Sequence, residues 1–197
     1  RLNRFSLLQP KWQDNGHRFM LKQRVITAVI LLALLLPALF YPNPIPFNAI
    51  TLVLIAAAGW EWARLNGCAQ KPALLWGGVL GVVLAALWLT VGLNATGPWI
   101  WWFAGGFWLL LTPWLLKQGI SGWPLVPRWL RLGVGWVLIG LAWWAMAQAR
   151  DQGIGMLLSI LLLVWVADVA AYFGGKALGK RKLAINISPG KSWEGAI

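Results

Sequence analysis

Long apolar stretches separated by short polar breaks dominate the pattern of this 197-residue chain. A transmembrane helix needs about 20 mostly apolar residues, and six stretches come close to that length. Proline- and glycine-rich breaks such as "YPNPIPF", "NATGP" and "SGWPLVP" follow three of them, as expected for turns between helices. The pattern therefore predicts an all-α fold, a polytopic transmembrane helical bundle of about six helices. The predicted spans are 22–40, 47–64, 74–93, 98–116, 131–148 and 153–174.

Composition agrees with a membrane protein. Charged residues make up 11% of the chain and hydrophobic residues 59%, whereas a soluble globular domain carries about 25% charged residues. The 17 tryptophans fit the same interpretation, because indole rings favour the two membrane–water interfaces. Cys68 and His17 are the only cysteine and histidine. An intramolecular disulfide, a histidine metal cluster and Ser-His-Asp chemistry within this chain are therefore excluded.

The basic residues fall on alternate connections between the spans. Of the 17 lysines and arginines, 16 lie in alternate connections or within the first or last few residues of the spans that border them: before or at the start of the first span, between the second and third, between the fourth and fifth, or after the sixth. Arg150 is the exception. The positive-inside rule assigns such connections to the cytoplasm. We therefore expect a bacterial-type inner-membrane protein whose N-terminus and C-terminal loop are cytoplasmic. The net charge of +12 then describes a basic cytoplasmic face, and no nucleic-acid partner is expected.

Three parts of the chain differ in pattern. Residues 1–19 lack helical periodicity, and "MLKQRVITAVILL" resembles a natural start at Met20. The first part is therefore predicted to be a disordered extension, with a genuine arm on the membrane surface as the alternative. Residues 20–175 form the predicted membrane bundle. Residues 176–197 are predicted to be a cytoplasmic basic loop that enters a further helix, at which the chain is truncated.

Asp168 is the first candidate for chemistry, because it lies inside the sixth span. An ionisable side chain at the bilayer centre costs about 2.5–3.5 kcal/mol on insertion scales, and it is a functional hypothesis by default. Tyr172 and Gly175, at i+4 and i+7, lie on the same helix face. The alternative is a carboxylate that reaches the interface or pairs with Lys176.

Glu61 lies between two tryptophans at the cytoplasmic end of the second span. We predict that it pairs with Arg64 and has a structural role, and a catalytic role is the alternative.

The chain ends with a basic loop, "KRKLAINISPGKSWEG", that also carries hydroxyl groups and one carboxylate. Lysine and serine side chains are suited to binding phosphate. Pro189 and Gly190 predict a tight turn, and residues 191–195 predict a helix N-terminus whose amides favour phosphate. Glu194 is expected to fix Lys191 or to help hold a cation. The alternative is a basic juxtamembrane loop that binds anionic lipid without specificity.

The stretch from Asp168 to Gly195 resembles the phosphatidate cytidylyltransferases, also called CDP-diacylglycerol synthases. Their pattern is Asp-x-x-Ala/Ser-Tyr, then Gly-x-x-x-Gly-Lys, Lys-Leu and Ser-Pro-x-Lys-Thr/Ser-x-Glu-Gly. "LKQRVITA" at 21–28 and "GWEWARL" at 59–65 also resemble the family's first two helices. The matching positions are Asp168, Ala171, Tyr172, Gly175, Gly179, Lys180, Lys182, Leu183, Ser188, Pro189, Lys191, Ser192, Glu194 and Gly195.

The resemblance implies an enzyme of phospholipid biosynthesis. Such enzymes transfer a cytidylyl group from CTP to phosphatidic acid, giving CDP-diacylglycerol and pyrophosphate. Both reactants are anionic, so Mg²⁺ or another divalent cation is expected, together with CTP, phosphatidic acid and the bilayer as partners; a homodimer is left open. The resemblance implies catalytic roles for Asp168 and Lys191, with Asp168 also at the metal. Substrate or phosphate contacts are implied for Lys180, Lys182, Ser188, Ser192, Glu194 and Tyr172.

The chain departs from the family in one respect. The family's later signature, with Lys-Arg, Lys-Asp, His-Gly-Gly and Asp-Arg-x-Asp elements, is absent from residues 1–197. The resemblance places the family's metal-binding aspartates there, beyond residue 197, so this chain is expected to be a fragment that is inactive alone.

Two other functions stay open. A CTP-dependent polyprenol kinase resembles the same fold family and differs in its acceptor. A transporter or lipid translocase would use Asp168 as a coupling carboxylate, but no inverted repeat of broken helices supports it.

Overall fold

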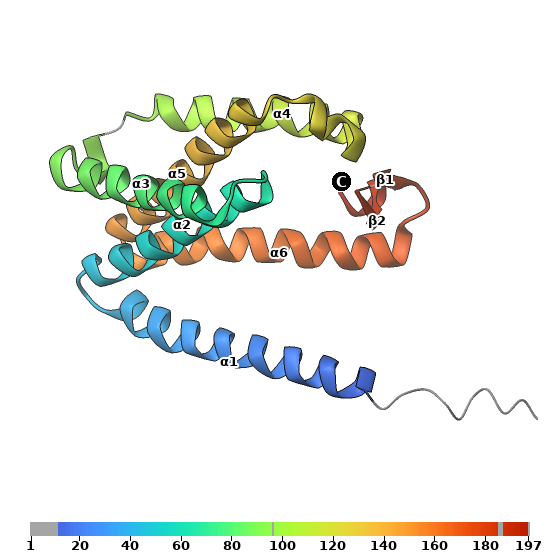
Figure 1. Cartoon of the computed structure of the whole chain (residues 1–197), viewed down its shortest axis with the longest axis horizontal. Helices are drawn as coiled ribbons and strands as arrows, with labels where there is room; N and C mark the ends of the chain where they lie inside the picture. The colour runs from blue at the N-terminus through green and yellow to red at the C-terminus, as the bar shows by residue number, and fades with distance from the viewer. Residues whose placement is uncertain (1–11, 96, 185–186, 197) are drawn as a thin grey trace, which may run out of the picture. The chain divides into compact units, whose positions relative to one another are not determined.

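The computed structural model describes residues 12–95, 97–184 and 187–196, and most of them are helical (Figure 1). Within these ranges, six helices are long and apolar enough to cross a membrane. Short 3₁₀ helices, η2 (Leu93–Ala95) and η3 (Trp123–Leu125), stand in two connections. The predicted bundle of six membrane helices is confirmed. The six helices are α1 (Trp12–Phe40), α2 (Ile45–Leu65), α3 (Gln70–Thr90), α4 (Trp99–Gly122), α5 (Arg128–Gln152) and α6 (Ile154–Leu178).

The predicted disordered extension over residues 1–19 is wrong for its second part, because α1 begins at Trp12. Helix formation is cooperative, and each residue added to an existing helix gains one hydrogen bond. The apolar span that begins near residue 22 can therefore carry the helix back into a segment without periodicity of its own. Residues 1–11 lie outside the described residues, and a natural start at Met20 stays a prediction.

Two compact units divide the chain at Phe47. The first contains α1 and the connection to α2. The backbone N–H of Tyr41 donates to the carbonyl of Pro37 at 3.0 Å, which closes the last turn of α1. The side-chain oxygen of Asn43 accepts a hydrogen bond from the backbone N–H of Ile45 at 2.9 Å. Such an Asx turn satisfies an amide that the first turn of a helix leaves free.

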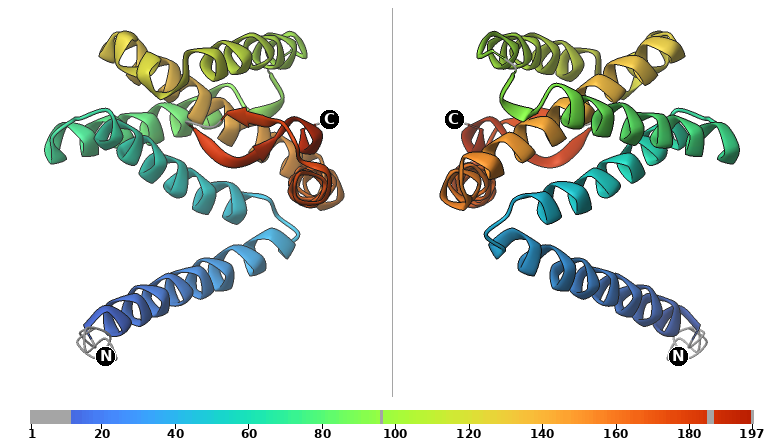
Figure 2. Two further views of the ribbon diagram at one scale, coloured as in Figure 1. Left: turned by 90° about the vertical axis from the view of Figure 1, so that its right-hand side faces the viewer. Right: turned by 90° about the vertical axis from the view of Figure 1, so that its left-hand side faces the viewer.

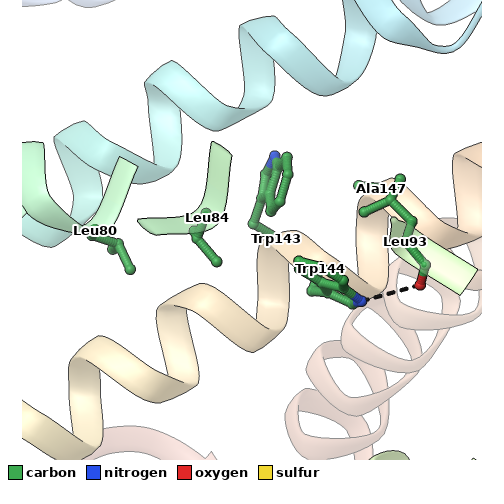
Figure 3. Close-up of a cluster of buried hydrophobic side chains, with 6 residues drawn as sticks. All are labelled: Leu80, Leu84, Leu93, Trp143, Trp144 and Ala147. Atoms are coloured by element: carbon green, nitrogen blue, oxygen red, sulfur yellow. Dashed lines mark hydrogen bonds between the residues drawn. The ribbon is translucent and has the colours of Figure 1, made fainter. Parts of the chain in front are cut away.

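A pair of tryptophans on α5 holds the second unit together. Trp143 and Trp144 are buried in one cluster with four smaller side chains (Figure 3). The indole N–H of Trp143 donates to the carbonyl of Asn48 and the hydroxyl of Thr51, both at 3.2 Å. The indole N–H of Trp144 donates to the carbonyl of Leu93, also at 3.2 Å. Helix α5 is therefore joined to α2 and η2 by hydrogen bonds inside an apolar core. The smaller side chains are Leu80, Leu84, Leu93 and Ala147.

An antiparallel hairpin follows α6, and the sequence did not predict it. Strand β1 (Lys182–Ala184) pairs with β2 (Ser188–Ser192), with an irregular register between the two pairs of opposite residues. A short 3₁₀ helix, η4 (Trp193–Gly195), follows β2.

The expected tight turn at Pro189 and Gly190 and the expected helix start at 191–195 are both wrong. Proline pushes the residue before it toward extended backbone and is tolerated in an edge strand. Strand β2 therefore runs from Ser188 through Ser192, and only a 3₁₀ turn follows it.

Replacing Trp143 by Phe should destabilise the protein by about 1–2 kcal/mol, because it removes the indole donor shared by two buried acceptors. Trp102→Phe is the matched control, since Trp102 is 82% exposed. The midpoint of thermal unfolding in detergent would be measured for both variants. Equal midpoints for the two would contradict the structural role given to Trp143.

Candidate functional site

The structure brings together Asp168 and Lys191, which the sequence analysis assigned to one site. The ammonium nitrogen of Lys191 lies 3.4 Å from a carboxylate oxygen of Asp168, as a hydrogen bond and ion pair. Asp168 comes from α6 and Lys191 from β2, 23 residues later. The alternative pairing of Asp168 with Lys176 is not what the described residues show.

The hairpin reaches Asp168 by lying against the C-terminal part of α6 (Figure 2). Asp168 stands ten residues before Leu178, the last residue of this helix (178 − 168). At a rise of 1.5 Å per residue, that separation is about 15 Å along the axis. A lysine that follows the helix end would not reach so far back unless the chain reversed direction. The hairpin supplies this reversal and carries Lys191 to a carboxylate inside the membrane-crossing stretch.

The ion pair is open to its surroundings. The Lys191 side chain is 53% exposed and that of Asp168 77%. Exposed ion pairs contribute about 0–1 kcal/mol to stability, so this contact adds little to folding. An accessible lysine and carboxylate can instead exchange their contact for a ligand phosphate and a cation, which makes the pair better suited to chemistry than to holding the fold.

Glycines allow the hairpin to pack directly on α6. A Cβ atom on Gly195 would lie 2.5 Å from the carbonyl oxygen of Ala171 and 2.9 Å from the backbone nitrogen of Gly175. A Cβ atom on Gly179 would meet the carbonyl oxygen of Gly175 and lie 2.7 Å from the hydroxyl of Ser192. Real Cβ atoms do not approach backbone atoms so closely. These glycines therefore have a packing role in the motif that contains them.

Glu194 anchors the chain where it leaves α6. Its carboxylate accepts hydrogen bonds from the backbone N–H groups of Lys180 at 3.1 Å and Arg181 at 3.2 Å. Its own backbone N–H, those two amides and the Arg181 charge hold the pKa of Glu194 below its usual value, although desolvation acts in the opposite direction. The expected contact of Glu194 with Lys191 is not formed, because Lys191 bonds to Asp168.

The other basic candidates lie where the chain leaves α6 and enters the hairpin. Lys180 and Lys182 are exposed, and so is Arg181 between them. Arg181 was not among the predicted site residues, although it stands in the same run of basic residues. The sequence gives no sign of its backbone contact with Glu194, because that contact depends on the hairpin.

The two predicted serines are less exposed than the lysines around them in the sequence. Ser188 is half-buried, opposite Ala184 in the hairpin. Ser192 is only 5% exposed, and its hydroxyl has no hydrogen-bond partner among the described residues. A Cβ atom on Gly175 would lie 3.0 Å from this hydroxyl, so Ser192 faces α6. Its contact with phosphate stays a prediction.

Tyr172 is not joined to the ion pair by any contact in the described part of the chain. Its side chain is 59% exposed. Its ring packs edge-to-face against Phe173, with the ring centroids 5.3 Å apart. A substrate contact for Tyr172 therefore stays a prediction.

One carboxylate at this site is suited to a divalent cation. No group of three His, Cys, Asp or Glu side chains gathers within the described ranges. Mg²⁺, however, is usually bound by one or two carboxylates together with substrate phosphates and waters. The exposed carboxylate of Asp168 fits such a role, whereas Glu194 already uses its carboxylate on two backbone amides.

Glu61 has the structural surroundings that the sequence predicted. Its carboxylate lies 3.9 Å from the guanidinium of Arg64. That guanidinium in turn stands 5.4 Å from the ring centroid of Trp60. The pairing of Glu61 with Arg64 is confirmed.

The chain is similar to known proteins along most of its length. The sequence profile described as "Cytidylyltransferase family" matches residues 22–197. The phosphatidate cytidylyltransferase of Pseudomonas aeruginosa is 35% identical over 182 residues, which cover 89% of this chain and 65% of that protein. Its namesake in Haemophilus influenzae is 35% identical over 204 residues, with coverages of 90% and 68%. The Brucella suis protein of the same name is 31% identical over 188 residues, with coverages of 90% and 62%.

The chain thus spans about two thirds of the length of these relatives. No solved structure matches it significantly.

Replacing Gly195 by Ala should loosen the hairpin from α6, because the new Cβ would collide with backbone atoms of α6, which cannot move away as a flexible side chain could. Overpacking of this kind costs about 1–3 kcal/mol, which corresponds to roughly 5- to 160-fold more of the undocked state. Trypsin cleavage after Arg181 and Lys182 should accelerate accordingly. Gly190→Ala is the control, since a Cβ there has nothing within 4 Å. Equal cleavage rates in the two variants would contradict glycine-dependent docking.

Acid should release the anchor formed by Glu194. Because its folded pKa lies below the ordinary value of 4.5, the contribution of its carboxylate is fully present above that value and is lost as pH falls through the folded pKa. Hydrogen exchange, corrected for the intrinsic effect of pH, should show falling protection of the Lys180 and Arg181 amides at acid pH. In Glu194→Gln these amides should be less protected and insensitive to pH. Equal protection of these two amides in wild type and Glu194→Gln at neutral pH would contradict the anchor.

Proposed function

We propose that this chain, which belongs to the cytidylyltransferase family, is part of an enzyme that transfers a cytidylyl group from CTP to phosphatidic acid. The products are CDP-diacylglycerol and pyrophosphate. The observation that carries the proposal is the contact between Asp168, on a membrane-crossing helix, and Lys191, on the hairpin that follows it. The names of the relatives, phosphatidate cytidylyltransferase, support the same reaction.

The reaction joins two anions. A phosphate oxygen of phosphatidic acid attacks the α-phosphorus of CTP, the bond to the oxygen that bridges to the β-phosphorus breaks, and pyrophosphate leaves with the electron pair of that bond. Catalysis of phosphoryl-type transfer depends mainly on positioning and on neutralising charge. Three exposed lysines supply positive charge for this purpose: Lys180, Lys182 and Lys191.

Lys191 is the lysine with a defined position. Its contact with Asp168 holds the ammonium group over α6 before substrate arrives. On binding, the ammonium group exchanges its contact with Asp168 for one with a phosphate oxygen. The exposed carboxylate of Asp168 would also hold a divalent cation such as Mg²⁺. When bound, that cation neutralises phosphate charge and orients the reacting groups.

The two substrates would reach this site from different sides. Six helices capable of crossing a membrane and bacterial relatives support an integral membrane protein. The positive-inside pattern supports an inner-membrane protein with the N-terminus and the hairpin on the cytoplasmic side. CTP would then arrive from the cytoplasm and phosphatidic acid from the bilayer. Placing the ion pair on a spanning helix puts it where both can meet.

Asp168→Asn and Lys191→Ala should each lower turnover by about 10²–10³-fold, the usual effect of removing one preorganised electrostatic contact. Folding should be unaffected, because the exposed pair adds little stability. The assay uses the whole protein in detergent with radiolabelled CTP, phosphatidic acid and Mg²⁺, and it counts label in the lipid phase. Lys71→Ala is the control, since Lys71 is an exposed lysine on α3.

Near-normal turnover in either variant would remove that residue from the site. A folded wild-type protein that transfers no label to phosphatidic acid would overturn the proposed function. Phosphorylation of an added polyprenol by CTP would then favour the kinase alternative.

A further inference from the structure

A second place in the molecule has the features of a ligand site. A cavity of about 330 Å³ is lined by residues of α2, α4, η3 and α5, a volume within the range of about 300–1,000 Å³ typical of ligand pockets. Its lining is apolar except for Arg131, the one charged residue among those that line it. No lining residue comes from α6 or the hairpin. The cavity is therefore distinct from the candidate catalytic site.

The connection between α4 and α5 builds one end of this cavity. Gly119 has φ 64° and ψ −166° within α4, a conformation that essentially only glycine adopts. The chain turns sharply there and continues into η3. Trp123 of η3 then packs edge-to-face against Trp62 of α2, with ring centroids 6.0 Å apart, and both tryptophans line the cavity.

The two tryptophans also hold Arg131. The indole N–H of Trp62 donates to the carbonyl oxygen of Arg131 at 3.1 Å. The guanidinium of Arg131 stands 5.5 Å from the ring centroid of Trp123. Its Nε atom is buried and has no hydrogen-bond partner among the described residues. A buried donor without a partner costs about 1–3 kcal/mol, so an acceptor on a ligand would stabilise this arrangement.

A phosphate is the acceptor best matched to this position. Arginine binds phosphate through charge-assisted hydrogen bonds. Arg131 also lies in the first turn of α5, where the helix dipole favours negative charge. Arg128, the first residue of α5, lies beside it in a part of the chain that the charge pattern assigns to the cytoplasm. Anionic lipids of the cytoplasmic leaflet concentrate near such basic segments.

We propose that this cavity binds an anionic phospholipid of the bilayer, with the lipid phosphate at Arg131 and one acyl chain along the apolar wall. The proposed lipid is a resident ligand of a site that shares no residue with the candidate catalytic site. A second copy of the chain, or a further helix, that covered the cavity with apolar side chains would leave the Arg131 donor unpaired. In a lipid, the acyl chain covers the apolar wall and the phosphate pairs with the charge of Arg131.

Native mass spectrometry of the whole protein in detergent tests the proposal, with phosphatidylglycerol and phosphatidylcholine as the two probes. Wild type should bind phosphatidylglycerol more tightly than phosphatidylcholine. Arg131→Gln should weaken phosphatidylglycerol binding about tenfold, the effect expected from losing one charge-assisted contact. Lys117→Gln removes an equal charge from an exposed side chain outside the cavity lining, and its binding should match wild type.

Leu138→Trp gives a second test that keeps Arg131. Leu138 lines the cavity, and a larger side chain there should displace the acyl chain and lower phosphatidylglycerol retention. Unchanged binding in both cavity variants would overturn the proposal, as would equal losses in Arg131→Gln and Lys117→Gln. A dimer that dissociates when Leu138 is replaced would also overturn it, because a second copy would then fill the cavity.

Discussion

The backbone contact between Gly195 and α6 is the constraint on which the candidate site depends. Without a side chain at Gly195, η4 lies against the carbonyl of Ala171 and the backbone of Gly175. This contact fixes the end of the hairpin, and Glu194 fixes its beginning through the amides of Lys180 and Arg181. Lys191 lies between these two anchors in the chain and therefore meets Asp168. Packing and hydrogen bonding thus place the charges, and the charges themselves contribute little to folding.

A different set of residues holds the membrane-crossing helices of the second unit together. In lipid, the hydrophobic effect does not drive helices to associate with one another. Close packing and hydrogen bonds between helices therefore contribute more to their association. Trp143 and Trp144 provide both, because each fills the core and donates to a backbone carbonyl of another element. Trp62 does the same between α2 and α5. Several of the abundant tryptophans therefore link one helix to another inside the protein.

The sequence predicted the structural features that depend on local residue patterns. Six apolar stretches define the six helices, and the pairing of Glu61 with Arg64 follows from helical spacing. Asp168 and Lys191 were assigned to one site from a motif, and the structure joins them. The hairpin was not predicted, since strands of three and five residues give almost no periodic signal. The burial of Ser192 and the hydrogen-bond partners of Glu194 depend on that hairpin, so the sequence did not predict them either.

A double-mutant cycle on cytidylyl transfer tests most directly whether Asp168 and Lys191 act as one unit. Turnover would be compared in Asp168→Asn, Lys191→Ala and the double variant of the whole protein. Contacting residues show coupling energies of about 0.5–3 kcal/mol, whereas distant sites are additive. The structure predicts that the double variant is little worse than the more damaged single variant. Losses that multiply would mean that the two residues act independently, and they would contradict the placement of Lys191 at Asp168.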